Sequence, residues 1–107
     1  MTLPLRAGLA AALVLAASAV HAAAPASAVV PIKSFAFMPM SVTVAVGGSV
    51  TWKNLDGEPH TVTSTDGLFR SAGLDQGDSF TVKFSKPGVY RYVCSIHPQM
   101  RAEVVVK

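Results

Sequence analysis

The sequence predicts an all-β protein, an antiparallel β-sandwich of seven to eight strands, on three observations. Short segments rich in Val, Thr and aromatic residues alternate between apolar and polar positions. Turn-forming Gly, Pro, Asp and Asn separate these segments at nearly regular intervals, which is typical of a sandwich. Beyond residue 24, no stretch has the apolar spacing of an amphipathic helix. The length of 107 residues allows one such domain.

The first 22 residues are predicted to be a secretory signal peptide and no part of this fold. A weakly basic start precedes an Ala/Leu/Val run over residues 7–20, which is shorter than a bilayer span, and small residues around Ala22 resemble a cleavage site. An uncleaved anchor and a core helix are the alternatives. Cleavage after Ala22 leaves a mature domain of residues 23–107 and places it in the periplasm.

The expected strands follow in order along residues 23–107. Residues 28–32 form the first, and residues 41–46 and 49–54 alternate cleanly on either side of Gly47-Gly48, which predicts a hairpin. Four more strands are expected at residues 60–64, 78–84, 89–94 and 101–107. The stretch bracketed by Asp66-Gly67 and Gln76-Gly77 is expected to be an irregular loop. The aromatic residues at alternating strand positions are expected to pack in the interior: Trp52, Phe80, Phe84, Tyr90 and Tyr92.

Charge and cysteine content limit the function classes. Removal of residues 1–22 leaves eight Lys and Arg, six Asp and Glu, and a net charge of +2. The charges are spread along the chain without a basic run, so neither nucleic acid nor a membrane surface is an expected partner. The single cysteine, Cys94, cannot form an internal disulfide. A lone thiol in an exported protein therefore requires another role, such as dimerisation, reaction or metal binding.

Potential metal ligands gather where the strand at residues 89–94 ends. Cys94, His97 and Met100 recur at every third position, and His60 is the one other histidine of residues 23–107. A sandwich can bring two loops that are distant in sequence together at one end. Two imidazoles and a thiolate in a roughly trigonal plane, with a thioether as a weak axial ligand, are the ligand set of a blue copper electron-transfer centre.

Each of these residues also has a more ordinary interpretation, as a buried inert thiol, a strand-end histidine or a methionine that fills a gap in the core. One site would nevertheless use the only cysteine, both histidines of residues 23–107 and a methionine at fixed spacing, which favours the metal site. Met38 and Met40 lie outside this pattern. We expect them to pack in the core or at its rim and not to bind an accessory copper.

The chain resembles the cupredoxins, the family of blue copper proteins, and within that family it is similar to the amicyanins and plastocyanins. The resemblance covers nearly all of residues 23–107. It rests on the segment 41–54, on Pro59-His60, on the Pro-Gly-Val-Tyr-Arg-Tyr-Val-Cys run that ends at Cys94, and on the short Cys-x-x-His-Pro-x-Met loop of residues 94–100. That loop is of the amicyanin type.

The resemblance implies an eight-stranded Greek-key sandwich that carries one type 1 copper. It also implies that His97 has a partly exposed edge for the electron, ringed by apolar residues such as Pro59 and Pro98. Thr61 stands where these relatives have an Asn that ties the two copper loops together, and its hydroxyl is the group that could make a similar bond. The implied ligands are His60, Cys94, His97 and Met100.

The resulting hypothesis is a monomeric, soluble, periplasmic one-electron carrier that cycles between Cu(I) and Cu(II) and is not an enzyme. The resemblance implies transient redox partners, such as a dehydrogenase as donor and a c-type cytochrome as acceptor. Copper delivery or storage is the alternative function, and it would need an open, exchangeable site. A structural zinc site is less favoured because a thioether rarely completes zinc coordination.

Overall fold

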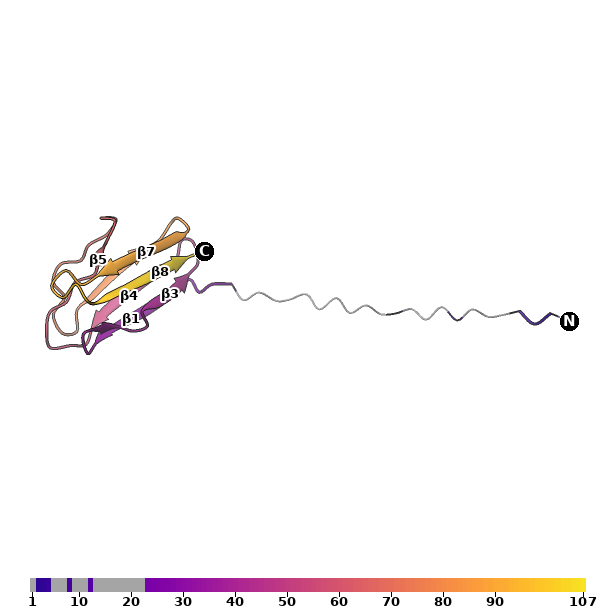
Figure 1. The fold of residues 1–107 in the computed structure, drawn as a ribbon, viewed down its shortest axis with the longest axis horizontal. Helices are drawn as coiled ribbons and strands as arrows, with labels where there is room; N and C mark the ends of the chain where they lie inside the picture. Colours follow the sequence, from indigo (N-terminus) through magenta and orange to yellow (C-terminus); the bar gives the residue numbers. More distant parts are fainter. Residues whose placement is uncertain (1, 5–7, 9–11, 13–22) are drawn as a thin grey trace.

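The computed structural model describes residues 2–4, 8, 12 and 23–107. Most of the predicted signal segment, residues 1–22, lies outside the described residues. The described part of the chain folds into two four-stranded sheets that pack face to face (Figure 1). Among these residues, no helix has the length and apolar character needed to cross a membrane.

The strand order defines the two sheets. The first sheet has the order β2-β1-β4-β6, with β2 at Ala36–Phe37, β1 at Ser27–Lys33, β4 at Ser49–Asn54 and β6 at Ser79–Lys83. The second has the order β3-β8-β7-β5, with β3 at Ser41–Val44, β8 at Arg101–Val106, β7 at Gly88–Val93 and β5 at Thr63–Ser64. The predicted all-β sandwich is confirmed. The expectation that all strands pair antiparallel is corrected: each sheet is mixed, because β1 pairs with β4 and β3 pairs with β8 in parallel.

The predicted hairpin across Gly47-Gly48 is wrong, because β3 and β4 lie in different sheets. The connection crosses from one sheet to the other, and Gly47 adopts a left-handed φ of 85° there. A Cβ on Gly48 would lie only 2.7 Å from the Ala45 carbonyl oxygen and 2.8 Å from that of Ala26, so the crossing needs glycine. Alternation along each strand shows which side chains face inward, but it does not show which strand is the partner.

The core lies between the sheets and is rich in aromatic side chains. Trp52 from β4 and Tyr92 from β7 are 0% and 1% exposed, and their rings meet edge to face at a centroid distance of 5.2 Å. Phe84 is also buried, while Phe80 and Tyr90 are partly buried against the same cluster. The prediction that the strand aromatics pack in the interior is confirmed. Burying each large apolar side chain stabilises the fold by about 1.5–3 kcal/mol.

Three connections meet at one end of this core. The parallel strands β1 and β4 finish together, since Ile32 is in register with Asn54. The β1–β2 turn at residues 34–35 therefore lies beside the segment that begins at residue 55. The loop that joins β7 to β8, residues 94–100, closes the same end from the other sheet (Figure 1). We call residues 34–35, 55–61 and 94–100 the loop end.

Candidate metal centre

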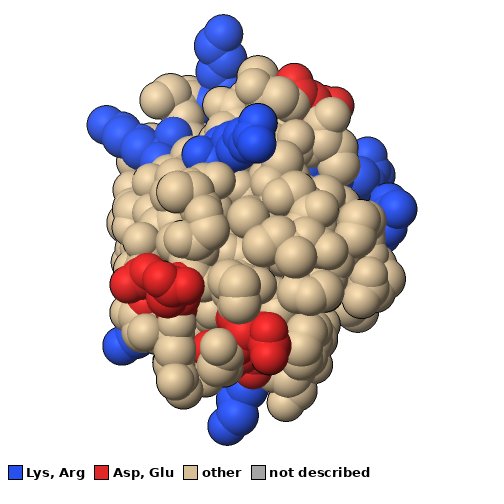
Figure 2. Space-filling model, turned by 90° about the vertical axis from the view of Figure 1, so that its left-hand side faces the viewer, with Lys and Arg blue, Asp and Glu red and all other residues tan. Residues whose placement is uncertain are grey.

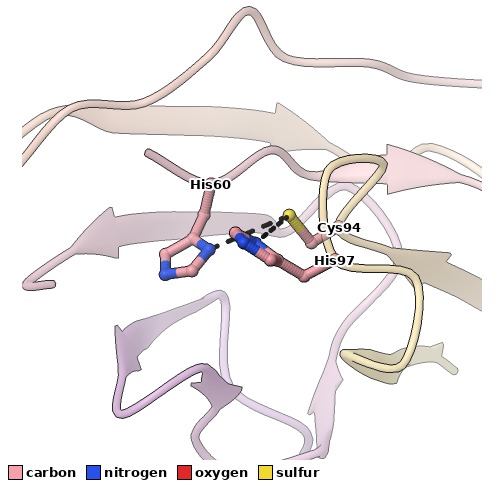
Figure 3. A group of neighbouring side chains, drawn as sticks. All are labelled: His60, Cys94 and His97. Carbon is pink, nitrogen blue, oxygen red and sulfur yellow. Dashed lines mark hydrogen bonds between the residues drawn. The ribbon is translucent and has the colours of Figure 1, made fainter. Parts of the chain in front are cut away.

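Three of the four predicted ligands come together at the loop end. The side chains of His60, Cys94 and His97 point toward one another in Figure 3. The Cys94 Sγ atom lies 3.8 Å from His60 Nδ1 and 3.7 Å from His97 Nδ1, and the three ligand atoms all lie within 4.8 Å of one another. His60 and Cys94 are fully buried, whereas His97 is half-buried.

These separations match ligands around a shared ion. Nitrogen and thiolate ligands bind first-row divalent ions at about 2.0–2.3 Å, and two such bonds at trigonal angles place the ligand atoms about 3.7 Å apart. The observed sulfur–nitrogen distances of 3.7 and 3.8 Å fit this value. The donor set, two imidazole nitrogens with one soft sulfur, suits copper. The arrangement is thus that of a trigonal metal site.

Met100 occupies the end of the same loop. Its side chain is 3% exposed and belongs to the core cluster. The Met100 N–H donates to the His97 carbonyl at 2.9 Å, and the Cys94 N–H donates to the Met100 carbonyl at 3.1 Å. These two bonds fold residues 94–100 into a compact loop. The backbone therefore brings Met100 close to Cys94 and to the half-buried His97.

The pKa of the Cys94 thiol is lowered by its surroundings. Burial raises its pKa, but hydrogen bonds from the Thr61 N–H, the His60 ring and both the N–H and the ring of His97 outweigh burial and lower the pKa from 9.0 to about 6. The thiolate is consequently the main form at neutral pH. The thiolate is also the form that binds a metal ion.

The remote side of the His60 ring is held by Asp56. Its Oδ2 atom lies 2.9 Å from His60 Nε2, which leaves Nδ1 directed at the Cys94 sulfur. Partial burial raises the pKa of Asp56, but the N–H groups of Phe35 and Ser34 and the His60 ring lower it by more, so the carboxylate is charged. Sequence reasoning missed Asp56. The available signal was an acidic residue four positions before a candidate ligand.

Thr61 ties the two ligand loops together. Its N–H donates to the Cys94 sulfur at 3.3 Å, and its hydroxyl accepts the Ser95 N–H at 2.8 Å. The Ser95 hydroxyl also lies 2.8 Å from the Thr61 hydroxyl. A threonine hydroxyl thus makes the loop-to-loop bond that the resemblance assigned to an asparagine.

The outer surface of the loop end is apolar near His97. Phe35 and Ile96 are 46% and 49% exposed, and Pro59 and Pro98 are exposed as well. Figure 2 views this end of the molecule and shows uncharged side chains across its middle, with Lys and Arg mainly above and to the right and Asp and Glu mainly below. Exposed apolar side chains therefore adjoin the one half-buried ligand, with the Phe35 ring 5.1 Å from the His97 ring.

Met38 and Met40 do not pack in the core. Their side chains are 53% and 66% exposed, so of the two expected positions, core or rim, the core is wrong. Both lie in the segment between β2 and β3, which runs over the surface between the two sheets. The sequence contained no alternation around them that could have distinguished surface from core.

An all-β sandwich with a His-Cys-His cluster and a buried methionine at one end defines the class of blue copper proteins, and the four residues form the arrangement of a type 1 site. A family model described as a cupredoxin-like domain matches residues 6–106. The chain belongs to the cupredoxin family.

Named relatives fit this family. The chain is 37% identical over 94 residues to amicyanin-alpha of Methylorubrum extorquens, a match that covers 83% of this chain and 79% of that protein. It is 33% identical over 89 residues to amicyanin of Paracoccus versutus, which covers 78% of this chain and 67% of that one. Plastocyanin of Tetradesmus obliquus is 36% identical over 72 residues, or 57% of this chain and 50% of that protein.

Solved structures are similar as well. A purple cupredoxin from Nitrosopumilus maritimus superposes with a TM-score of 0.69 at 34% identity, covering 75% of this chain and 99% of that one. The Cu(I) structure of an amicyanin variant gives a TM-score of 0.72 at 29% identity over 78% of this chain and 85% of the other. Family and site together indicate a blue copper electron carrier.

Proposed function

We propose that this protein carries single electrons between redox proteins in the periplasm, with one type 1 copper bound by His60, Cys94, His97 and Met100. Bound copper supplies the chemistry, one electron exchanged between the Cu(I) and Cu(II) states. The observation that supports the proposal most directly is the trigonal cluster of two imidazole nitrogens around the Cys94 sulfur.

The ligands are held by the fold, which suits electron transfer better than metal exchange. Cys94 and His60 are 0% exposed, and Thr61 and Met100 close the two loops over them by hydrogen bonds. A fixed, enclosed site needs little rearrangement when its charge changes. Copper delivery, the alternative function, calls for ligands that open readily to solvent, and only His97 is partly exposed here.

The apolar surface around His97 suits brief contacts with a partner protein. His97 contributes the one ligand ring that reaches the surface, beside Phe35 and Ile96. A small uncharged patch binds weakly, and electron-transfer complexes are characteristically small and transient. We propose a donor such as a dehydrogenase and an acceptor such as a c-type cytochrome, both engaging this patch in turn.

Export and the absence of enzymatic activity are further parts of the proposal. The apolar N-terminal segment supports cleavage after Ala22 and a periplasmic mature domain of residues 23–107. Among the described residues, both histidines and the cysteine belong to one cluster, so a second, catalytic copper centre has no imidazole ligands left within them.

Copper titration of the purified mature domain tests the function. We expect one Cu(II) per chain and an intense thiolate-to-copper absorption band in the visible range. A mild reductant should bleach this band completely, a mild oxidant should restore it, and the cycle should be repeatable. Cys94→Ser should abolish the band, whereas Met40→Leu, which removes an exposed thioether outside the site, should leave it unchanged. A colourless protein that takes up Cu(I) and releases it readily to a chelator would favour delivery or storage instead.

A further inference from the structure

The carboxylate of Asp56 accepts hydrogen bonds from three N–H groups at the loop end. Its Oδ1 atom accepts the Ser34 N–H at 2.7 Å, and Oδ2 accepts the Phe35 N–H at 2.9 Å. The same Oδ2 lies 2.9 Å from Nε2 of His60, and the Asp56 side chain is only 13% exposed. One side chain thus joins the β1–β2 turn to a buried ligand.

The turn that Asp56 binds has an unusual backbone. Ser34 and Phe35 have φ values of 54° and 58°, although neither is glycine. Such left-handed conformations cost roughly 1–2 kcal/mol per residue. Successive N–H groups in a tight turn can converge on one anion, and the Asp56 carboxylate fills that position. The turn therefore depends on this carboxylate to offset its backbone strain.

The turn places an aromatic ring against both ligand imidazoles. The Phe35 ring lies 5.1 Å from the His60 ring and 5.1 Å from the His97 ring, edge to face at 85° and 84°. These are favourable aromatic distances and angles. Asp56 thereby orients His60 directly through Nε2, and it orients His97 indirectly through the position of Phe35.

We propose that Asp56 is a positioning residue that sets the reduction potential of the metal centre, by holding His60 with Nδ1 toward the metal and by fixing Phe35 over both imidazoles. This inference rests on the proposed copper site. A carboxylate that accepts the remote N–H of a ligand imidazole makes the ring a stronger donor and brings a negative charge near the ion. Both effects stabilise the higher oxidation state, so Asp56 lowers the potential.

Asp56→Asn tests the proposal, with Glu58→Gln as the matched control. Both substitutions remove one negative charge from the same loop, but Glu58 is an exposed residue two positions away. We expect Asp56→Asn to favour Cu(I) over Cu(II) by about tenfold, which for one electron is a rise of about 59 mV in potential. Glu58→Gln should change the ratio far less, and Asp56→Glu should restore part of the shift.

A second readout uses the metal-free protein. Hydrogen exchange of the Ser34 and Phe35 amides should be slow in the wild type and in Glu58→Gln, and fast in Asp56→Asn. If Asp56→Asn accelerates this exchange yet has the same potential as Glu58→Gln, Asp56 only stabilises the turn and the proposal is overturned.

The unmutated protein provides a test that does not depend on any variant folding. In the Cu(I) form, nitrogen-15 NMR should show the Nε2 proton of His60 to be present and slow to exchange compared with the ring N–H of His97. Equal exchange at the two rings would overturn the proposal. A wild type without the visible copper band would instead overturn the proposed function, and this inference with it.

Discussion

Trp52 in the interior and Cys94 at the loop end are both buried, but their surroundings are stabilised by different interactions. In the interior, strands from both sheets pack aromatic and aliphatic side chains against one another. At the loop end, hydrogen bonds made by the side chains of Asp56, Thr61 and the adjoining Asn54 hold irregular backbone in place. Apolar burial is non-directional, whereas hydrogen bonds fix both distance and angle.

This difference separates stability from the geometry of the site. Substitutions in the interior should reduce the free energy of unfolding strongly while the ligands keep their positions. Substitutions at the loop end should cost less stability and yet disturb the metal centre more. Variants in each region separate the two effects. Their stability is measured on metal-free protein because metal binding adds to the apparent free energy of folding.

Trp52→Ala should cause the largest loss of stability. The side chain is 0% exposed and contacts the rings of Phe69, Phe80 and Tyr92. Removing it should lower the free energy of unfolding by about 3–5 kcal/mol, as measured by urea denaturation. The copper-loaded variant should keep its visible band at the wild-type wavelength. If the wavelength of the band shifted as much in Trp52→Ala as in the loop-end variants, the interior and the loop end would not be independent in their effect on the metal centre.

The stability of the metal-free protein should depend on pH through Cys94. Its pKa is lowered from 9.0 to about 6 in the folded state, so the folded state binds fewer protons than the unfolded state between these values. The free energy of unfolding should therefore rise by about 2–4 kcal/mol from pH 6 to pH 9, at about 1.4 kcal/mol per pKa unit, and this contribution should be lost as pH falls through 6.

The control for this pH dependence is Cys94→Ser under the same reducing, metal-free conditions. This variant should lack the rise, because a serine hydroxyl does not ionise in that range. If Cys94→Ser and the wild type have the same pH profile in urea denaturation, the hydrogen bonds around the sulfur do not stabilise a thiolate.

Asn54→Ala should cost about 2 kcal/mol of stability, since buried groups that lose a hydrogen-bond partner cost roughly 1–3 kcal/mol. Asn54 is 0% exposed and donates to the Glu58 and Leu74 carbonyls at 2.8 Å, while its oxygen accepts the Asp56 N–H at 2.9 Å. Because these bonds shape the segment that carries His60, the variant should also lose copper to a chelator faster. Lys53→Ala, at the exposed neighbouring position, should match the wild type in both measurements.

Thr61→Val should have the smallest effect on stability, about 1 kcal/mol, with a clear effect on the metal centre. The substitution removes the hydroxyl that accepts the Ser95 N–H and leaves the backbone bond from Thr61 to Cys94. We expect a shifted copper band and potential. Thr51→Val removes a comparable hydroxyl contact, 2.8 Å to Thr81 in an exposed setting, and should leave the band unchanged. Equal spectra for both variants would contradict a role for the loop tie.

The interior was more predictable from sequence than the pairing of its strands. The alternation along residues 49–54 placed Trp52 in the interior, and Trp52 and Val50, two positions before it, are both 0% exposed. The same alternation suggested a hairpin between β3 and β4, which is wrong because the chain crosses between sheets at Gly48. Side-chain period reports the buried face of a strand, whereas its partner depends on the packing of the whole chain.

At the loop end, the residue types that bind metal were identifiable, and their surroundings were not. Cys94 and His97 share one loop, and His60 was the one remaining histidine of residues 23–107, so composition alone brought them together. Asp56 and Phe35 could not be found this way. The spacing of four positions between Asp56 and His60 was the one local signal. The contacts of Asp56 with Phe35 depend on a left-handed turn between β1 and β2 and on the parallel register of β1 with β4, and neither leaves a local pattern in the sequence.

A crystal structure of the copper-loaded domain, with anomalous scattering recorded at the copper edge, tests the central claim most directly. The account predicts a single copper between Nδ1 of His60, Sγ of Cys94 and Nδ1 of His97, with the Met100 sulfur at a longer distance. It also predicts that the three nearer ligands keep the separations of 3.7 and 3.8 Å. Copper bound at the exposed Met38 or Met40, or a Cys94 sulfur without a metal bond, would contradict it.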